Sequence, residues 1–162
     1  MSRIVIYGNS GAGKSTLAKK FSKNDNLSHL DLDTLAWKES QPPERRNIHE
    51  SATEIESFLE SNSNWVIEGC YADLLELVVA QSTQLIFLNP GIDACTQNCR
   101  QRPWEAHKYP SKEEQDKNLE LLLGWVKQYE SRGDEFSLQA HQTLFDRFKG
   151  DKACYLSLDE YR

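Results

Sequence analysis

An eight-residue segment near the N-terminus, GNSGAGKS at positions 8–15, limits the fold of this chain more than any other feature. It matches the pattern G-x-x-x-x-G-K-[ST] at every fixed position. The apolar, β-branched run RIVIY at residues 3–7 precedes it, and Leu17, Ala18 and Phe21 follow it on one face of a predicted helix. A strand, a glycine-rich turn and a helix in this order predict a parallel α/β sheet with a phosphate-binding loop at its start.

The residue types of this loop suit phosphate chemistry. Glycines let the backbone turn tightly enough to aim N–H groups at phosphate oxygens, and the start of the helix adds the positive end of its dipole. In this pattern Lys14 contacts the β- and γ-phosphates, while the Ser15 hydroxyl binds Mg²⁺. A chance glycine-rich turn is the alternative, expected in roughly one chain in a hundred of this size. We therefore predict that a nucleoside triphosphate is bound by Gly8, Asn9, Ser10, Gly11, Ala12, Gly13, Lys14, Ser15 and Thr16.

Short apolar runs alternate with helical patterns along the rest of the chain. Strands are predicted at residues 3–7, 27–32, 65–67, 85–88 and 153–158. Helices are predicted at residues 13–23, 48–59 and 72–80, over about ten residues ending near 101, through 119–129 after a capping box at 111–114, and from Gly133-Asp134 onward. This alternation predicts a three-layer α/β/α P-loop NTPase fold with a parallel five-stranded sheet.

The size and composition of the chain limit its class. Its 162 residues suit a single domain over positions 1–162. No apolar run is long enough to cross a bilayer, and the N-terminus passes directly into a predicted strand, so we expect a cytoplasmic protein with no membrane partner. Because Cys70, Cys95, Cys99 and Cys154 lack the paired spacing of a zinc site, we expect reduced thiols.

Basic side chains gather in two short segments of an otherwise acidic chain. Residues 1–23 carry five basic and no acidic side chains, and residues 100–112 carry four and one. Residues 24–99 carry 3 basic and 13 acidic side chains, and residues 113–162 carry 7 and 11. The net charge of −6 argues against a nucleic-acid partner. The two basic segments instead indicate a small anionic ligand.

Acidic side chains follow the second and third predicted strands. Asp31 and Asp33 end the second strand, and Glu68 ends the third. Ligands of doubly wound sheets bind beyond the carboxyl ends of the strands, where the phosphate loop also lies. A polar strand ending without a ligand is the alternative for the two aspartates. The chain lacks the Asn-Lys-x-Asp motif of guanine-specific GTPases and is too short for a motor or AAA-type ATPase, which leaves a small P-loop kinase.

The segments HLDLDTLAW (29–37) and WVIEGCY (65–71) resemble those of adenylate-kinase and shikimate-kinase type phosphotransferases. The most similar are small bacterial kinases described as topology-modulation or adenylate-kinase-related proteins, and the resemblance covers most of the chain. It implies that Asp33 binds the acceptor and can serve as base for its hydroxyl. It also implies that Asp31, often His in those relatives, lies near Mg²⁺, and it leaves open whether Asp31 or Asp33 is the main acid that binds the acceptor. Glu68 takes the place of the acid, in many relatives Asp, that holds Mg²⁺ through water.

The second basic segment, about residues 100–112, resembles the short helical lid of these kinases, and we call it the lid segment. The resemblance implies that Arg100 and Arg102 close onto the transferred phosphoryl group, where a guanidinium can bind two oxygens. A solvated basic loop is the alternative. The lid segment also contains Trp104, His107 and Tyr109, interpreted as packing residues or contacts to a base.

An adjacent basic pair, Arg45-Arg46, falls in the region of about residues 34–60 where this family binds its acceptor. Such a pair suits an acceptor that carries phosphate or carboxylate. Ion pairing with Glu50 or Glu54 is an equal alternative. His29, His49 and His141 are interpreted as surface or packing residues.

Together these features predict an ATP- and Mg²⁺-dependent phosphotransferase acting on a small molecule, either nucleotide-like or a hydroxy acid. Lys14, Arg100 and Arg102 would stabilise the transferred charge, and Ser15 and Glu68 would hold Mg²⁺. One alternative is an ATP-binding or ATP-hydrolysing regulator that acts through a protein partner, and another is an inactive kinase fold. Monomer and homodimer, ATP and GTP, and the identity of the acceptor all stay open.

Overall fold

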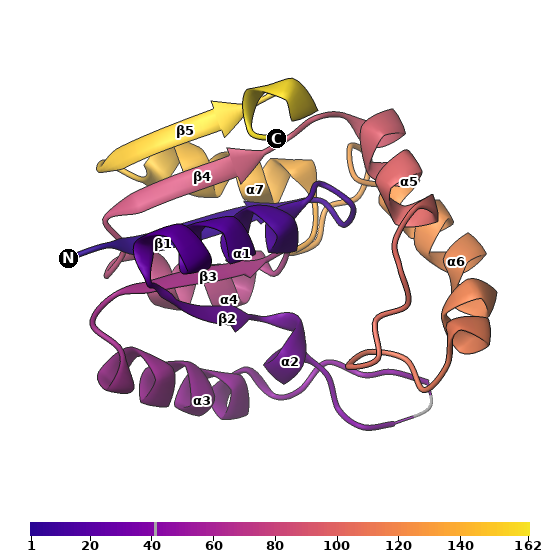
Figure 1. Ribbon diagram of the computed structural model, residues 1–162, viewed down its shortest axis with the longest axis horizontal. Coiled ribbons are helices and arrows are strands. Elements are labelled where there is room, and N and C mark those ends of the chain that lie inside the picture. Colours follow the sequence, from indigo (N-terminus) through magenta and orange to yellow (C-terminus); the bar gives the residue numbers. More distant parts are fainter. Residues whose placement is uncertain (41) are drawn as a thin grey trace.

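Strand β1 (Arg3–Gly8) lies at the centre of a five-stranded parallel sheet, and Figure 1 shows the strands side by side. A computed structural model describes residues 1–40 and 42–162. The strand order is β2-β3-β1-β4-β5. The other strands are β2 (Ser28–Asp31), β3 (Trp65–Gly69), β4 (Gln84–Leu88) and β5 (Asp151–Tyr155). The predicted sheet of five parallel strands is therefore confirmed.

Helices cover both faces of the sheet because the central strands are apolar on both sides. On one face, Ile4 and Ile6 pack with helices α1 (Lys14–Asp25), α5 (Ile92–Arg100) and α6 (Lys112–Lys127). On the other face, Val5 and Tyr7 pack with α3 (Ile48–Ser61), α4 (Ala72–Val79) and α7 (Leu138–Arg147). Figure 1 shows α1 in front of the sheet and α4 and α7 behind it. This is the predicted α/β/α arrangement of three layers.

Several element boundaries differ from the sequence prediction. Helix α6 begins at Lys112, where the Ser111 hydroxyl accepts a hydrogen bond of 3.2 Å from the Glu114 N–H, as the capping box predicts. The start predicted at Gly133-Asp134 is wrong, because α7 begins at Leu138 after the cap Ser137. The Asp134 carboxylate instead accepts the Phe136 N–H at 3.0 Å and forms a turn. Two short elements, helix α2 (Asp33–Ala36) and the 3₁₀ helix η1 (Leu158–Glu160), were not predicted.

None of the described helices, in residues 1–40 and 42–162, has the length and apolar character needed to cross a membrane. Three of the four thiols, those of Cys70, Cys95 and Cys99, are buried, and Cys154 is half-buried. All four are free, so the fold is held without a disulfide between them.

A buried histidine joins the sheet to the helices behind it. His141 has no solvent exposure, and its Nε2 lies 2.8 Å from the Cys70 carbonyl oxygen. Since that carbonyl can only accept, Nε2 carries the proton and Nδ1 accepts from the Tyr129 hydroxyl at 2.7 Å. The interpretation of His141 as a packing residue is confirmed.

Burial lowers the pKa of His141 to about 4, from 6.5. Between these values the unfolded chain binds a proton that the folded protein does not, so stability is expected to fall as the pH drops through this window. The slope should approach about 1.4 kcal/mol per pH unit. Urea unfolding of wild type and His141→Gln from pH 7 to pH 4 measures this, and the wild-type advantage should shrink toward low pH. A pH-independent difference between the two proteins would contradict the expectation.

Candidate active site

The phosphate loop connects β1 to α1 at the carboxyl edge of the sheet. Gly11 and Gly13 have φ angles of +85° and +90°, in the left-handed region where a side chain is strained. The Lys14 ammonium donates to the Asn9 carbonyl oxygen at 2.8 Å, so this side chain folds back over the loop. The Asn9 amide in turn donates to the Val126 carbonyl oxygen of α6 at 3.2 Å. All nine residues predicted to bind nucleotide lie in this loop and the first turn of α1.

Helix α5 packs against the phosphate loop at Gly11. A Cβ atom added to Gly11 would lie 2.2 Å from the Cys95 carbonyl oxygen and 2.8 Å from the Cys99 sulfur, so only glycine fits. The Asn98 amide donates to the Gly11 carbonyl oxygen at 2.8 Å. The phosphate loop therefore packs directly against the backbone of α5.

Glu68 links the phosphate loop to the neighbouring strands. Its Oε1 accepts the Ser15 hydroxyl at 2.7 Å, and its Oε2 lies 2.7 Å from the His29 Nε2. The carboxylate is almost fully buried, and Glu68 stands opposite Asp31 in the β2–β3 register. The interpretation of His29 as an ordinary surface or packing residue misses this contact. The alternation of β2 carries a signal for it, because His29 and Asp31 are two residues apart and share one face of the strand.

The oxygen donors at this edge fit Mg²⁺. The Ser15 hydroxyl and the Glu68 carboxylate are in direct contact, and Asp31 lies on the adjacent strand. Burial, together with the neighbouring carboxylates of Asp33 and Glu68, raises the pKa of Asp31 to about 6. Within the described residues no group of three or more His, Cys, Asp or Glu forms a metal cage. Mg²⁺ needs no such cage, since it commonly takes one or two protein ligands, water and substrate phosphates.

Asp33 lies at the start of α2, at the carboxyl edge of the sheet where the phosphate loop also lies, and accepts two hydrogen bonds from Tyr71 and Lys108, which were not predicted as binding residues. The Tyr71 hydroxyl donates to Asp33 Oδ1, and the Lys108 ammonium lies 2.7 Å from Oδ2. Burial alone would raise the pKa of Asp33, but Lys108 and the Tyr71 hydroxyl hold it below its usual range. The Trp37 indole N–H donates to the Tyr71 oxygen at 2.8 Å. The site therefore presents an ionised carboxylate held in place from two sides.

Lys108 reaches Asp33 from the lid segment. Its ammonium also lies 3.4 Å from Glu105 and 4.0 Å from Asp31, so three carboxylates surround it. Burial would lower the pKa of Lys108, yet these carboxylates, Asp33 above all, raise it. In Figure 1 the chain descends from α5 to the level of α2 before it rises into α6. The connection at 101–111 has turns but no helix. The lid segment is therefore a loop between α5 and α6, not the short helical lid that was predicted.

The two arginines predicted for the lid lie differently. Arg102 directs its guanidinium toward the phosphate loop, 3.4 Å from the Ser10 hydroxyl. Arg100 is about half exposed, and its nearest carboxylate is that of Glu120 at 3.9 Å. The structure thus brings Arg102, and not Arg100, to the phosphate loop. Within the lid segment, the Trp104 indole N–H donates to the Tyr109 carbonyl oxygen at 3.0 Å, while the Trp104 side chain is exposed.

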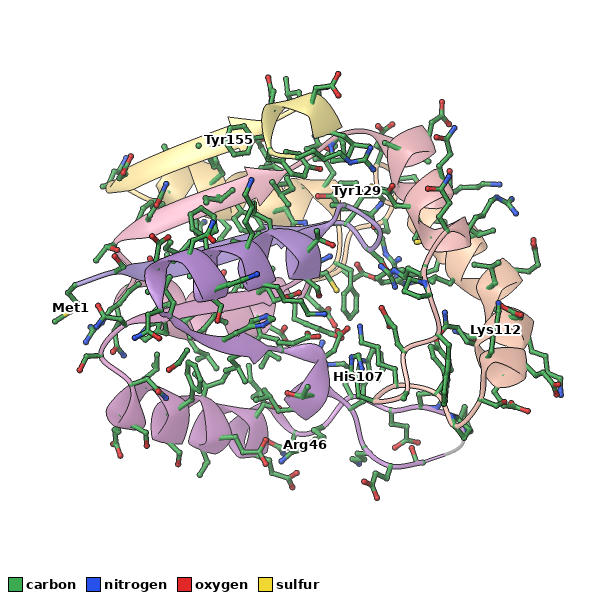
Figure 2. All side chains as sticks on the ribbon, in the orientation of Figure 1. Met1, Arg46, His107, Lys112, Tyr129 and Tyr155 are labelled. Carbon is green, nitrogen blue, oxygen red and sulfur yellow. The ribbon has the colours of Figure 1, made fainter. Side chains whose placement is uncertain are left out.

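Arg45 and Arg46 are adjacent in sequence but pair with different carboxylates. Arg45 lies 3.0 Å from both Asp73 and Glu135. Arg46 lies 2.9 Å from Glu54 and 3.6 Å from Glu50, beside the start of α3 and at the periphery of the molecule in Figure 2. For Arg46 the contacts are those of the ion-pair alternative. The structure does not place the two guanidinium groups together on one anion.

No family model and no curated protein matches this chain. Among solved structures, the deoxyadenosine kinase of M. mycoides with bound dATP is 12% identical, with a TM-score of 0.52 over 98% of this chain and 94% of that one. A sugar kinase from Janibacter sp. HTCC2649, unliganded, is 11% identical, with a TM-score of 0.50 over 96% of this chain and 85% of that one. At such identities the likeness shows the fold. The chain has the α/β fold of P-loop kinases, with five parallel strands and helices on both faces.

Proposed function

We propose that this protein is an ATP- and Mg²⁺-dependent phosphotransferase that moves the γ-phosphoryl group to a hydroxyl of a small molecule. The observation that carries the proposal is the meeting of two groups at one sheet edge. A phosphate loop with a complete Lys14-Ser15 pair lies at the same carboxyl edge of the sheet as Asp33, whose carboxylate is ionised and fixed by Tyr71 and Lys108. A nucleotide-binding switch would need the loop alone. A carboxylate beside it is what an acceptor hydroxyl requires.

Each charged group has a place in the proposed reaction. Lys14 and Arg102 bind phosphate oxygens, and Ser15 and Glu68 would hold Mg²⁺, which supplies further neutralisation of phosphate charge. The acceptor oxygen forms a bond to the γ-phosphorus as the bond to the β-phosphate oxygen breaks, and ADP leaves. Asp33 accepts the proton of the acceptor hydroxyl. The exposed position of Arg100 supports no direct role for that side chain in the arrangement described.

The comparisons favour this reaction class. The two structural neighbours are kinases of a nucleoside and of a sugar, and one holds dATP. ATP as donor and membership of the topology-modulation-like group, which rests on the segments at 29–37 and 65–71, are part of the proposal. So are a cytoplasmic location, a monomer or homodimer, and the lack of a nucleic-acid or membrane partner.

Incubation of the purified protein with γ-labelled ATP, Mg²⁺ and a panel of nucleosides, nucleotides, sugars and hydroxy acids tests the function. We expect label to move to at least one acceptor, and transfer to stop when Mg²⁺ is chelated. The Ser15→Ala variant should need more Mg²⁺, because it lacks a metal ligand. ATP hydrolysis without transfer to any acceptor, together with capture of a specific protein partner, would instead favour the regulatory alternative.

A further inference from the structure

We infer that the acceptor is uncharged at the end that meets Asp33: a hydroxyl compound such as a sugar, nucleoside or polyol, and not a phosphate ester or carboxylic acid. The inference rests on the proposed function and narrows its acceptor. It comes from how the cations around Asp33 are already used. Recognition of an acidic acceptor requires a cation that is free to pair with it.

Arg45 is the first of these cations, and two carboxylates occupy its guanidinium. Its NH2 group donates to both Asp73 oxygens at 3.0 and 3.2 Å, and its NH1 group donates to Glu135 at 3.0 Å. The remaining Nε donates to the Ala36 carbonyl oxygen at 3.3 Å. The flat face of the guanidinium lies 4.8 Å from the centre of the Tyr71 ring, the same tyrosine that holds Asp33. The three guanidinium nitrogens of Arg45 are thus hydrogen-bonded, and one face of the group packs on Tyr71.

Arg132 is a second cation in this neighbourhood and is satisfied in a similar way. It lies 5.6 Å from the Phe136 ring, at the same distance as Arg45. Its guanidinium pairs with Asp134 at 2.8 Å and stacks on Trp125 at 4.4 Å. Neither arginine therefore offers an unpaired edge to a ligand anion.

Lys108 is the cation nearest to Asp33, and more than one carboxylate surrounds it. Asp33, Glu105 and Asp31 lie within 4.0 Å of its single ammonium. One positive charge among three carboxylates leaves the surroundings of Lys108 negative, and Lys14, the other cation that acts on Asp33, is the one proposed to bind the nucleotide phosphates. An anionic acceptor would therefore be repelled there unless it displaced a carboxylate. A hydroxyl group meets no such barrier, because an ionised Asp33 is a strong acceptor of its hydrogen bond.

One exposed aromatic side chain in this neighbourhood suits an uncharged ring. Trp37 is 39% exposed and packs edge to face on the buried Tyr71, with ring centres 6.3 Å apart, and its indole N–H donates to the Tyr71 hydroxyl. An exposed aromatic face binds the apolar faces of sugars and bases. The chemistry of the whole neighbourhood is that of a neutral, hydroxyl-bearing ligand.

Matched pairs of acceptors test this inference in the wild-type protein. Each pair contains one neutral and one acidic member: a nucleoside and its 5′-monophosphate, a hexose and its 6-phosphate, and a polyol and the corresponding acid. Binding is measured by calorimetry with Mg²⁺ and a non-hydrolysable ATP analogue already bound. In the pair that fits the site, we expect the neutral member to bind at least about tenfold more tightly. Equal binding, tighter binding of the acidic member, or binding of no neutral member would overturn the inference.

This measurement separates the inference from the proposed function, since it requires no phosphoryl transfer. A preference for neutral members without turnover would count against the function alone. Turnover with a preference for acidic members would count against the inference alone. The double variant Asp73→Asn/Glu135→Gln releases Arg45 from its carboxylates and should strengthen binding of the acidic member by about tenfold. Glu44→Gln is the matched control, because Glu44 pairs only with exposed Lys38 at 3.6 Å, and it should leave the preference unchanged.

Discussion

Replacement of Lys14 by alanine is expected to weaken binding of ATP by about tenfold to a hundredfold, the value of one or two charge-assisted hydrogen bonds. Phosphoryl transfer should fall further, by about a hundredfold to a thousandfold, because charge on the γ-phosphoryl oxygens grows toward the transition state. The ammonium of Lys14 rests 2.8 Å from the Asn9 carbonyl oxygen at the mouth of the loop. The backbone N–H groups of the loop are neutral and cannot replace that charge.

Titration with a fluorescent ATP analogue and a steady-state assay measure the two effects. Lys19→Ala is the matched control, since Lys19 is an exposed lysine on the same helix and should leave both quantities unchanged. Thermal unfolding without nucleotide should give similar midpoints for the three proteins. Equal affinity of wild type and Lys14→Ala for the nucleotide would contradict the proposal that this loop binds the nucleotide phosphates.

Replacement of Asp33 by asparagine is expected to lower phosphoryl transfer by about a hundredfold to ten thousandfold, the usual contribution of a positioned general base. The change removes the charge and keeps the shape. The amide oxygen can still accept the Tyr71 hydroxyl, but it cannot take a proton from the acceptor. Because Asp33 contacts neither phosphate loop backbone nor Ser15 in the hydrogen bonds described, the affinity for ATP should stay within about twofold.

Glu105→Gln provides the comparison for Asp33→Asn. This substitution also removes a carboxylate from the surroundings of Lys108, whose ammonium lies 3.4 Å from Glu105 and 2.7 Å from Asp33. Unlike Asp33, Glu105 accepts no hydrogen bond from Tyr71 in the bonds described. We expect a loss of less than about tenfold in this variant. A similar loss in both variants would mean that Asp33 acts only as a counter-ion of Lys108, and unchanged transfer in Asp33→Asn would remove it from the mechanism.

The parts of the fold that follow from local patterns could be predicted from the sequence. Burial of all four residues from Ile4 to Tyr7, which alternate between the two faces of the sheet, follows from an apolar run in the middle of a parallel sheet. The cap at Ser111 follows from residues only three positions apart. Asp134 shows the limit of such patterns, since an aspartate can cap a helix or close a turn, and packing of the segment decides between them.

The contacts that complete the site join segments far apart in the chain. Lys108 reaches Asp33 from a connection without periodic structure, and its partner cannot be read from spacing. Arg45 pairs with Glu135, a residue 90 positions away, so local neighbours such as Glu50 gave no indication of it. His29 meets Glu68 only because β2 and β3 lie in one particular register. These contacts depend on the three-dimensional arrangement, while the phosphate loop and the acids at the strand ends do not.

The seating of Gly11 on α5 has a mechanical consequence. The Asn98 amide donates to the Gly11 carbonyl oxygen and the Cys95 carbonyl packs against Gly11, so we expect the loop and α5 to move as one rigid body. We therefore expect any opening of the segment at 101–111 to pivot beyond Asn98, with the helix staying still. Lys108 would move with the 101–111 segment, and Asn98 would stay in place with α5. Arg102 would move with Lys108, so opening would withdraw its guanidinium from Ser10 while Lys14 keeps its place in the loop.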